Sequence, residues 1–292
     1  MDESTRLAQR FEEHRPHLRS VAYRMLGSLS EADDAVQDAW LRVARADTDT
    51  VENLKGWLTT VVSRVSLNML RTRAARREQP LDPPAADLDV GDGDGGQPEQ
   101  EALLADSVGL ALLVVLDRLT PDERLAFVLH DMFAMPFDEV GPMVERSPAA
   151  ARQLASRARR KVRGAPVPDT DLTRQRRVVD AYLAAVRSGD LAALVELLDA
   201  DVVLRADAHA VPSGKATVIR GAHTVAKGAL ASAGRAEFTR TALVDGAVGL
   251  VMAPRGRLGI VLRFVLADDR IVEIDVVADP DRLRRADLGV LD

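Results

Sequence analysis

The chain has 292 residues, of which 47% are hydrophobic and only 3% aromatic, and its formal net charge is −6. This length suits two or three domains with separate cores. The absence of cysteine excludes disulfides and thiolate metal sites, and we expect neither a metal nor a cofactor. No stretch approaches the roughly 18 apolar residues of a membrane span, and no apolar run follows a basic start, so we expect a cytoplasmic protein without a membrane partner.

Residues 1–77 are predicted to form a helical bundle. Apolar residues at helical spacing mark a first helix that ends at Gly27. Ser30, followed by Asp33, resembles a capping box and predicts a second helix over residues 30–46, apolar inside and acidic outside. A third helix, residues 53–75, is predicted to be capped by Asn53 and to bury Trp57; residues 53–77 hold six basic side chains and no acid.

Residues 78–102 are predicted to be a flexible acidic linker. The stretch 78–106 holds nine acids and no Lys or Arg around a Pro- and Gly-rich middle. This charge suits either a positively charged nucleic-acid channel or a simple solubilising tether.

A second helical segment is predicted over residues 103–164. Thr120 and Pro121 mark the start of a capped helix. Further on, a short helix over residues 136–144, the turn Glu145-Arg146 and a helix from Ser147 predict a helix-turn-helix.

The last helix of this segment, residues 147–163, carries six positive charges and no negative one. Its inner stripe is apolar, with Ala151, Leu154, Ala155, Ala158 and Val162. The contrast with the negative chain favours a nucleic-acid surface. The alternative is an ordinary solvated face whose charges favour the helix dipole.

After a short linker at residues 165–172, the pattern of residues 173–292 predicts an α+β domain. Two helices broken at Gly189 precede β-rich runs at residues 202–206, 236–244, 248–252, 258–266 and 271–277. A hairpin turn at residues 267–270 joins the last two, and we expect an antiparallel meander.

Four stretches carry a family resemblance: residues 30–43, 56–64, 119–131 and 149–159. They resemble regions 2 and 4 of bacterial extracytoplasmic function sigma factors. Residues 279–283 and, more weakly, 212–215 resemble a SnoaL-like domain fused to such factors. The resemblance implies a multidomain chain: two all-α sigma domains, a region 2 bundle and a region 4 helix-turn-helix, followed by a cone-shaped α+β SnoaL-like domain.

The function implied by the resemblance is that of a sigma factor rather than an enzyme. It would recruit core RNA polymerase to a two-element promoter in DNA and start transcription, regulated by its own SnoaL-like domain. Polymerase would bind the outer face of the second helix, at Asp33, Asp34, Gln37 and Asp38. Interdomain regulation would involve Lys215, Asp281, Arg282 and Leu283.

Promoter DNA would meet two basic helices. The downstream element would lie on Lys55, Arg64, Asn68, Arg71 and Arg73, and the loop at residues 47–52 would receive an unstacked base. For Asn68, a solvent-facing role is an equal alternative. The upstream element would be read by Arg152, Gln153, Ser156, Arg157 and Arg160. Of these, Arg152 and Gln153 are placed for base edges, whereas Arg157 and Arg160 suit phosphate.

Two other classes of function stay open. A polymerase-independent helix-turn-helix regulator would bind duplex promoter tightly by itself. A SnoaL-like enzyme with a DNA-binding half would turn over substrate at Asp207, His209 or His223. The sequence shows no constellation of acid, base and oxyanion donor around these three residues, so we assign no catalytic residue. A small-molecule ligand of the domain remains an alternative to catalysis.

Overall fold

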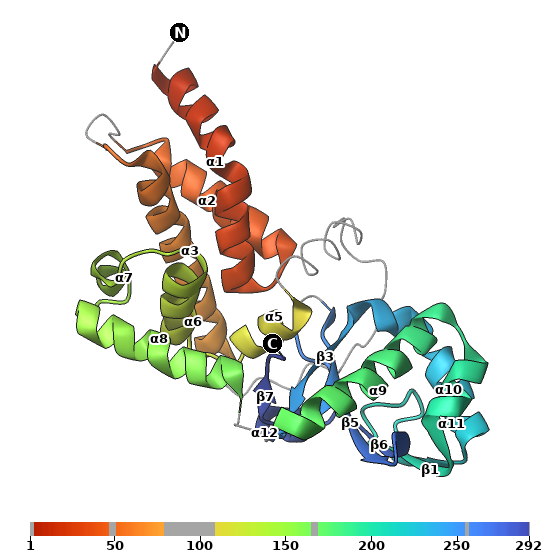
Figure 1. The fold of residues 1–292 in the computed structure, drawn as a ribbon. Helices are drawn as coiled ribbons and strands as arrows, with labels where there is room; N and C mark the ends of the chain where they lie inside the picture. The colour runs from red at the N-terminus through yellow and green to blue at the C-terminus, as the bar shows by residue number, and fades with distance from the viewer. Residues whose placement is uncertain (1–2, 47–50, 79–108, 165–168, 255–256, 292) are drawn as a thin grey trace. The chain divides into compact units, whose positions relative to one another are not determined.

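The computed structural model describes residues 3–46, 51–78, 109–164, 169–254 and 257–291 (Figure 1). They fall into two compact units. The first unit contains the described residues up to 78 together with residues 116–159, and the second contains residues 109–115 and those from 160 onward. The predicted acidic linker, except Glu78, lies outside the described residues.

A three-helix bundle opens the first unit. It consists of α1 (Glu3–Leu26), α2 (Leu29–Val43) and α3 (Leu54–Glu78). Each pair of these helices is in contact, and the core includes the fully buried Phe11, Leu18, Val36 and Val62.

The helix caps of the bundle differ in one place from the prediction. The cap of α2 is Ser28, whose hydroxyl accepts the N–H of Glu31, so the predicted cap at Ser30 was wrong. Because Gly27 takes a φ of 78° and ends α1, the cap of the next helix lies two residues earlier than expected. The cap at Asn53 is confirmed, since its Oδ1 accepts the N–H of Gly56 at 3.0 Å.

The second helical segment contains the predicted helix-turn-helix. Its elements are α5 (Leu110–Leu116), α6 (Pro121–Phe127), the π-helix η1 (Val128–Met132), α7 (Phe137–Met143) and α8 (Pro148–Arg163). Thr120 and Glu123 form the reciprocal capping box of α6, and Ser147 accepts the N–H of Ala150 at 3.2 Å to cap α8.

A close approach fixes the turn between α7 and α8. A Cβ atom on Gly141 would lie 2.8 Å from the carbonyl oxygen of Arg146, so only glycine fits there. Glu145 takes a φ of 55°, in the left-handed region, which turns the chain sharply. The fully buried Ala151, Ala155 and Ala158 then form the inner face of α8, as the periodicity predicted.

The second unit is built on a mixed sheet with helices. Its helices are α9 (Asp169–Ser188), α10 (Leu191–Leu197), α11 (Ala222–Ala231), the 3-10 helix η2 (Ala233–Phe238) and α12 (Pro280–Arg285). Its strands are β1 (Leu198–Ala206), β2 (Thr217–Arg220), β3 (Thr239–Val244), β4 (Ala247–Met252), β5 (Ile260–Ala267), β6 (Arg270–Val277) and β7 (Leu288–Gly289).

The sheet order is β2-β1-β6-β5-β4-β3-β7. The predicted α+β architecture of the SnoaL-like domain is confirmed. The expected antiparallel meander is confirmed for β3 to β6, but it was wrong for β1, because β1 pairs with β6 in parallel while the other neighbouring pairs are antiparallel. A parallel pair needs a long connection, and here β2, α11 and three further strands lie between the two partners.

Both faces of this sheet are covered. Side chains alternate between the two faces along β4, so Val248 and Leu250 lie on one face of the sheet and Val251 lies on the other. The first face packs against α9, α10 and α11, where Tyr182 meets the ring of Phe264 at 5.3 Å and burial raises the pKa of its hydroxyl.

On the opposite face, Ala111, Val114 and Val115 of α5 join a cluster with Val261 and Leu283. Helix α5 reads Leu-Ala-Leu-Leu-Val-Val-Leu and is apolar on every side, so it requires burial. Residues that the sequence places in the helix-turn-helix segment are therefore packed on the sheet of the C-terminal domain.

The end of α8 also belongs to the second unit. The N–H of Val290 donates to the carbonyl of Val162 at 2.9 Å, next to strand β7. A Cβ on Gly289 would lie 2.8 Å from the Cα of Gly164 and 2.9 Å from the carbonyl oxygen of Arg163, so the two backbones touch. Among the helices described here, none has the length and apolar character that a membrane span requires.

Candidate nucleic-acid interface

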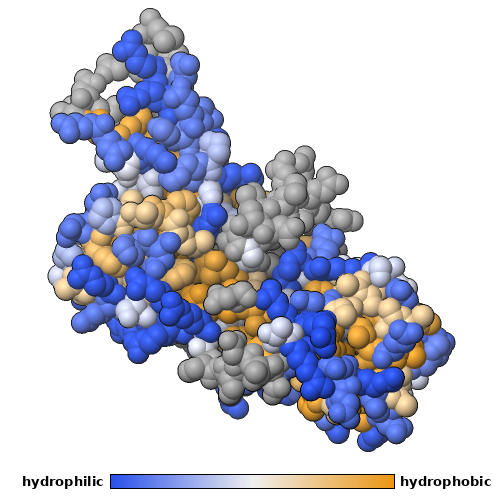
Figure 2. Space-filling model, in the orientation of Figure 1, coloured by the Kyte–Doolittle hydropathy of each residue, from blue (hydrophilic) through white to orange (hydrophobic). Residues whose placement is uncertain are grey.

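Helix α8 presents the basic face that its sequence predicts. All five of its candidate DNA-binding residues are exposed: Arg152, Gln153, Ser156, Arg157 and Arg160. Figure 2 shows a mainly hydrophilic surface over this helix. The alanine-lined inner face lets α8 lie close to the rest of its unit while its long side chains project outward.

Neighbouring groups distinguish the arginines of α8. The guanidinium carbon of Arg152 lies 5.3 Å from the centre of the Phe137 ring. By contrast, Arg157 faces the carboxylate of Glu123 at 4.0 Å, and Arg159 pairs with Asp131 at 2.5 Å. Sequence periodicity alone did not reveal the aromatic neighbour of Arg152, although an aromatic residue is conspicuous in a chain so poor in them.

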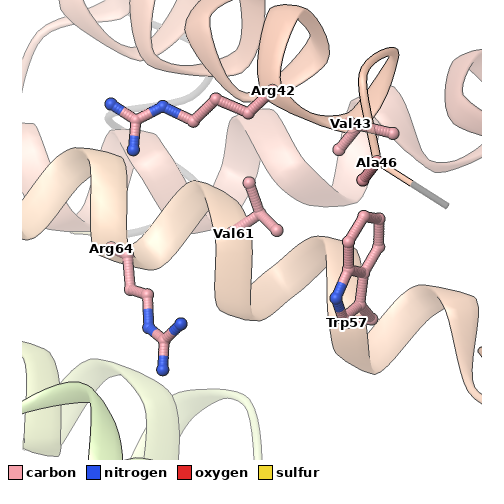
Figure 3. A pocket seen from close by; sticks show the side chains of 6 residues that line it. All are labelled: Arg42, Val43, Ala46, Trp57, Val61 and Arg64. Atoms are coloured by element: carbon pink, nitrogen blue, oxygen red, sulfur yellow. The ribbon is translucent and has the colours of Figure 1, made fainter. Parts of the chain in front are cut away.

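A second candidate surface runs along α3. Lys55, Arg64 and Asn68 are exposed on this helix. A pocket of about 310 Å³ opens beside them and is lined by Arg42, Val43, Ala46, Trp57, Val61 and Arg64. Figure 3 shows the indole of Trp57 rising from α3 toward Val43 and Ala46.

The position of Trp57 corrects the expectation that it belongs to the core, because it is half-buried and lines the pocket. Its ring offers a stacking surface for a nucleobase. The loop predicted to receive an unstacked base lies between Ala46 and the start of α3, but its residues 47–50 lie outside the described part of the chain.

Two arginines at the far end of α3 are engaged by protein carboxylates. Arg73 pairs with Glu31 and reaches the carbonyl of Leu26, with only 16% of its side chain exposed. We therefore correct its assignment to DNA: it joins α3 to the corner between α1 and α2. Arg71 is more exposed but pairs with Asp122 at 3.0 Å and lies 3.8 Å from Glu145.

The four candidate polymerase-binding residues form one exposed face of α2: Asp33, Asp34, Gln37 and Asp38. Arg19 of α1 donates two hydrogen bonds to Asp33, at 2.7 and 2.9 Å. The exposed Leu41 continues this face with half of its surface in solvent. The arrangement is an acidic surface with an apolar end, suited to a basic helical partner.

The candidate regulatory residues divide into two kinds. Lys215 and Asp281 are exposed. Arg282 instead pairs with Asp275 at 2.7 Å and faces Asp207 at 3.6 Å, and Leu283 is buried beside α5. Residues 279–283 thus fold onto their own unit.

The local geometry of this motif follows from one cap. The side chain of Asp279 accepts the N–H groups of Asp281 and Arg282 and starts α12. The backbone N–H of Arg282 donates to the Asp279 carboxyl and lowers its pKa. The backbone N–H of Asp281 donates to the same carboxyl and lowers the pKa further.

The strongest contacts among the residues considered for catalysis are those of Asp207, and they are contacts with the backbone. Asp207 accepts four backbone N–H groups, from His209, Ala210, Ala278 and Asp279. His209 faces Asp279 at 3.7 Å, and His223 is exposed in the first turn of α11. Within the described ranges, no group of three or more His, Asp or Glu side chains could hold a metal ion.

Comparison with known proteins identifies the two helical segments. Residues 10–76 match the family model of Sigma-70 region 2, and residues 109–162 match that of Sigma-70, region 4. The ECF RNA polymerase sigma factor SigJ of Mycobacterium tuberculosis is 37% identical over an alignment that covers 93% of this chain and 91% of SigJ. The probable ECF RNA polymerase sigma factor SigI of the same species is 34% identical, covering 94% of this chain and 95% of SigI.

Among solved structures, the crystal structure of Mycobacterium tuberculosis extracytoplasmic function sigma factor SigJ matches with a TM-score of 0.46 and 34% identity, over 94% of this chain and 97% of SigJ. The matched regions define a sigma factor of the sigma-70 type. The chain belongs to the extracytoplasmic function family of RNA polymerase sigma factors. Members bind core RNA polymerase and promoter DNA to start transcription, and the family is not one of enzymes.

Proposed function

We propose that this sigma factor reads a two-element promoter with α8 and α3, and that the tail of its own SnoaL-like domain, after Leu283, keeps it inactive. The observation that supports the first part is the pair of exposed basic surfaces, one on α3 beside the Trp57 pocket and one on α8. The acidic face of α2 then binds the polymerase. The place of action is the cytoplasm, where polymerase and promoter are.

Two arginines of α8 are assigned different roles: Arg152 reads a base and Arg160 contacts phosphate. Arg152→Ala is expected to reduce discrimination between upstream-element sequences about tenfold, because a bidentate guanine contact contributes roughly 1–3 kcal/mol. Arg160→Ala is expected to weaken binding to every sequence alike. The number of counterions released on binding, measured from the salt dependence of the affinity, should fall by about one. Titration of the polymerase holoenzyme against matched and mismatched promoters at several salt concentrations tests both. If neither variant alters sequence preference, the readout face is misassigned.

The second part of the proposal starts from contacts between region 2 and region 4 within the first unit, here named the closed contact: Arg71 with Asp122 and Glu145, Arg124 with the end of α1, and Phe133 with His17. The two carboxylates neutralise the charge of Arg71 and would repel a promoter phosphate that approaches it. The closed contact therefore suits an inactive form.

The buried charge of Arg124 makes the closed contact easier to open. Its side chain is only 2% exposed, donating from Nε to the carbonyl of Arg24 at 3.2 Å and facing Asp117 at 3.5 Å. Its Nη2 has no hydrogen-bond partner among the described residues, and burial lowers its pKa to about 10. The guanidinium thus stays charged at neutral pH in a buried place. Burying a charge in this way is costly, so the contact can open without a large input of free energy.

The SnoaL-like domain is connected to region 4 through the second unit. Its sheet packs against α5, and its last strand touches the end of α8. A shift of this domain would therefore act on the first and last helices of region 4. Regulation of this kind needs no small-molecule ligand, and we assign none. We also assign no catalytic role, because Asp207 is engaged by backbone N–H groups.

Neutralising the two carboxylates that pair with Arg71 should weaken the closed contact slightly and so tests its role. The double change Asp122→Asn and Glu145→Gln is expected to raise affinity for promoter DNA about two- to tenfold at low salt, since exposed ion pairs contribute roughly 0–1 kcal/mol each. The gain should shrink as salt screens the charges. The double change Asp138→Asn and Glu139→Gln, at two exposed acids in the first turn of α7, removes the same charge and is the matched control. Equal gains in control and test variants would mean that net charge alone is responsible.

A further inference from the structure

Three side chains of the helix-turn-helix form a stack that the proposed promoter contacts do not explain. The rings of His130 and Phe137 lie 3.8 Å apart between centres and are inclined by 24°. The guanidinium carbon of Arg152 lies 5.3 Å from the centre of the Phe137 ring. The three residues come from η1, the first residue of α7 and the first turn and a half of α8.

Local sequence features build this stack. The chain after α6 takes the wider π-helical turn, so the His130 side chain points in a different direction from the one that a continued α-helix would give it. Nδ1 of His130 lies 3.0 Å from the carbonyl oxygen of Met135, and since a carbonyl only accepts, Nδ1 carries the hydrogen. Pro136, in extended conformation, then starts α7 so that Phe137 is its first residue. Both rings are half-buried.

An aromatic face restrains an arginine beside it. A guanidinium is planar and weakly hydrated, and it is attracted to the negative face of an aromatic ring. An unrestrained arginine loses its rotamer freedom when it binds a base edge. An arginine that already lies on a ring loses less on binding, which favours the correct base through preorganisation.

We infer that Phe137, held in place by His130, is a positioning residue that orients Arg152 toward the base edge of the upstream element. This inference rests on the proposed assignment of Arg152 to base reading. Arg157 provides the contrast within the same helix: it is exposed, and its charged neighbour is the carboxylate of Glu123 at 4.0 Å. A phosphate contact tolerates many orientations of the side chain, whereas a bidentate base contact tolerates few.

The test uses the full-length chain bound to core polymerase and a pool of promoters with a randomised upstream element. Phe137→Leu keeps an apolar side chain of similar size and removes the ring. It is expected to reduce the preference for the base read by Arg152 about two- to fivefold, the range of an exposed cation–π contact, while affinity for unrelated duplex stays the same. Phe137→Tyr is expected to retain the preference, because it restores the ring.

Phe133→Leu is the matched control. Its ring also lies in region 4 but meets the His17 ring edge-to-face and lies beside the guanidinium of Arg24 rather than that of Arg152. Loosening the closed contact at Phe133 would change affinity for every sequence alike, so the base preference should not change. Thermal unfolding of each variant shows whether a loss follows from unfolding, which would lower all binding together. The inference is overturned if Phe137→Leu keeps the preference that Arg152→Ala loses. If Arg152→Ala also keeps the preference, the proposed assignment of Arg152 fails first, and the positioning role fails with it.

Discussion

Removing the tail after Leu283 is expected to raise promoter-directed transcription about tenfold or more. The deletion takes away β7, the bond from Val290 to the carbonyl of Val162 and the buried Leu288. Loss of a buried leucine alone contributes roughly 2–5 kcal/mol, and 1.4 kcal/mol shifts an equilibrium about tenfold. Freed from the tail, the end of α8 no longer holds region 4 in the inactive form. Multiple-round transcription with purified core polymerase measures the effect.

A single substitution separates this contact from the other effects of truncation. Gly289→Val places a side chain against Gly164 and the carbonyl of Arg163, so it should also raise transcription in the full-length chain. Gly228→Val is the control, because a Cβ added there on α11 meets no atom within 4 Å. Removing residues 169–292 should instead lower transcription, since α5 loses the sheet that buries it. A tail deletion that stays folded and transcribes no better than the full chain contradicts this account.

The second large effect is expected from locking the closed contact. The chain has no cysteine, so two introduced cysteines can be joined selectively. His17 and Phe133, whose rings lie 5.4 Å apart, are replaced by cysteine and linked with a short bis-methanethiosulfonate reagent, which forms a disulfide with each thiol and is cleaved by a reductant. Transcription should fall at least tenfold and return on cleavage, because Arg71 cannot leave its carboxylate partners.

A cross-link within region 2 provides the control. His17 also lies against Thr59, with Nε2 and Oγ1 3.1 Å apart, and a cysteine pair at these two positions joins α1 to α3 without touching region 4. This link should leave transcription close to that of the unlinked protein. Full activity of the chain linked between positions 17 and 133 would rule out an inactive closed form.

Local signals explain how much of the fold was predictable. The caps at Asn53, Thr120 and Ser147 and the alanine stripe of α8 depend on neighbours in sequence, and they were found. Strand β7 has two residues and forms only by pairing with β3, so no periodicity marks it. The apolar sequence of α5 predicts burial but not the surface that buries it. The parallel pairing of β1 with β6 likewise depends on contacts distant in sequence.

The candidate site shows the same limit. Helical spacing predicted which arginines of α8 face outward, because exposure follows from the position of the apolar stripe. It could not distinguish a phosphate-binding arginine from one in an ion pair. Arg73 finds Glu31 across 42 residues and Arg71 finds Asp122 across 51, so their partners are set by tertiary structure. The stack of His130, Phe137 and Arg152 also needs three elements to meet.

The most direct test of the central claim is the distance between region 2 and region 4 before and after promoter binding. Spin labels on cysteines at Thr72 of α3 and Glu139 of α7, both exposed, report it by pulsed electron resonance. The free full-length chain should give one short, narrow distribution, and the complex with core polymerase and promoter DNA a clearly longer one. The same distribution in both states would contradict a closed form that opens to transcribe.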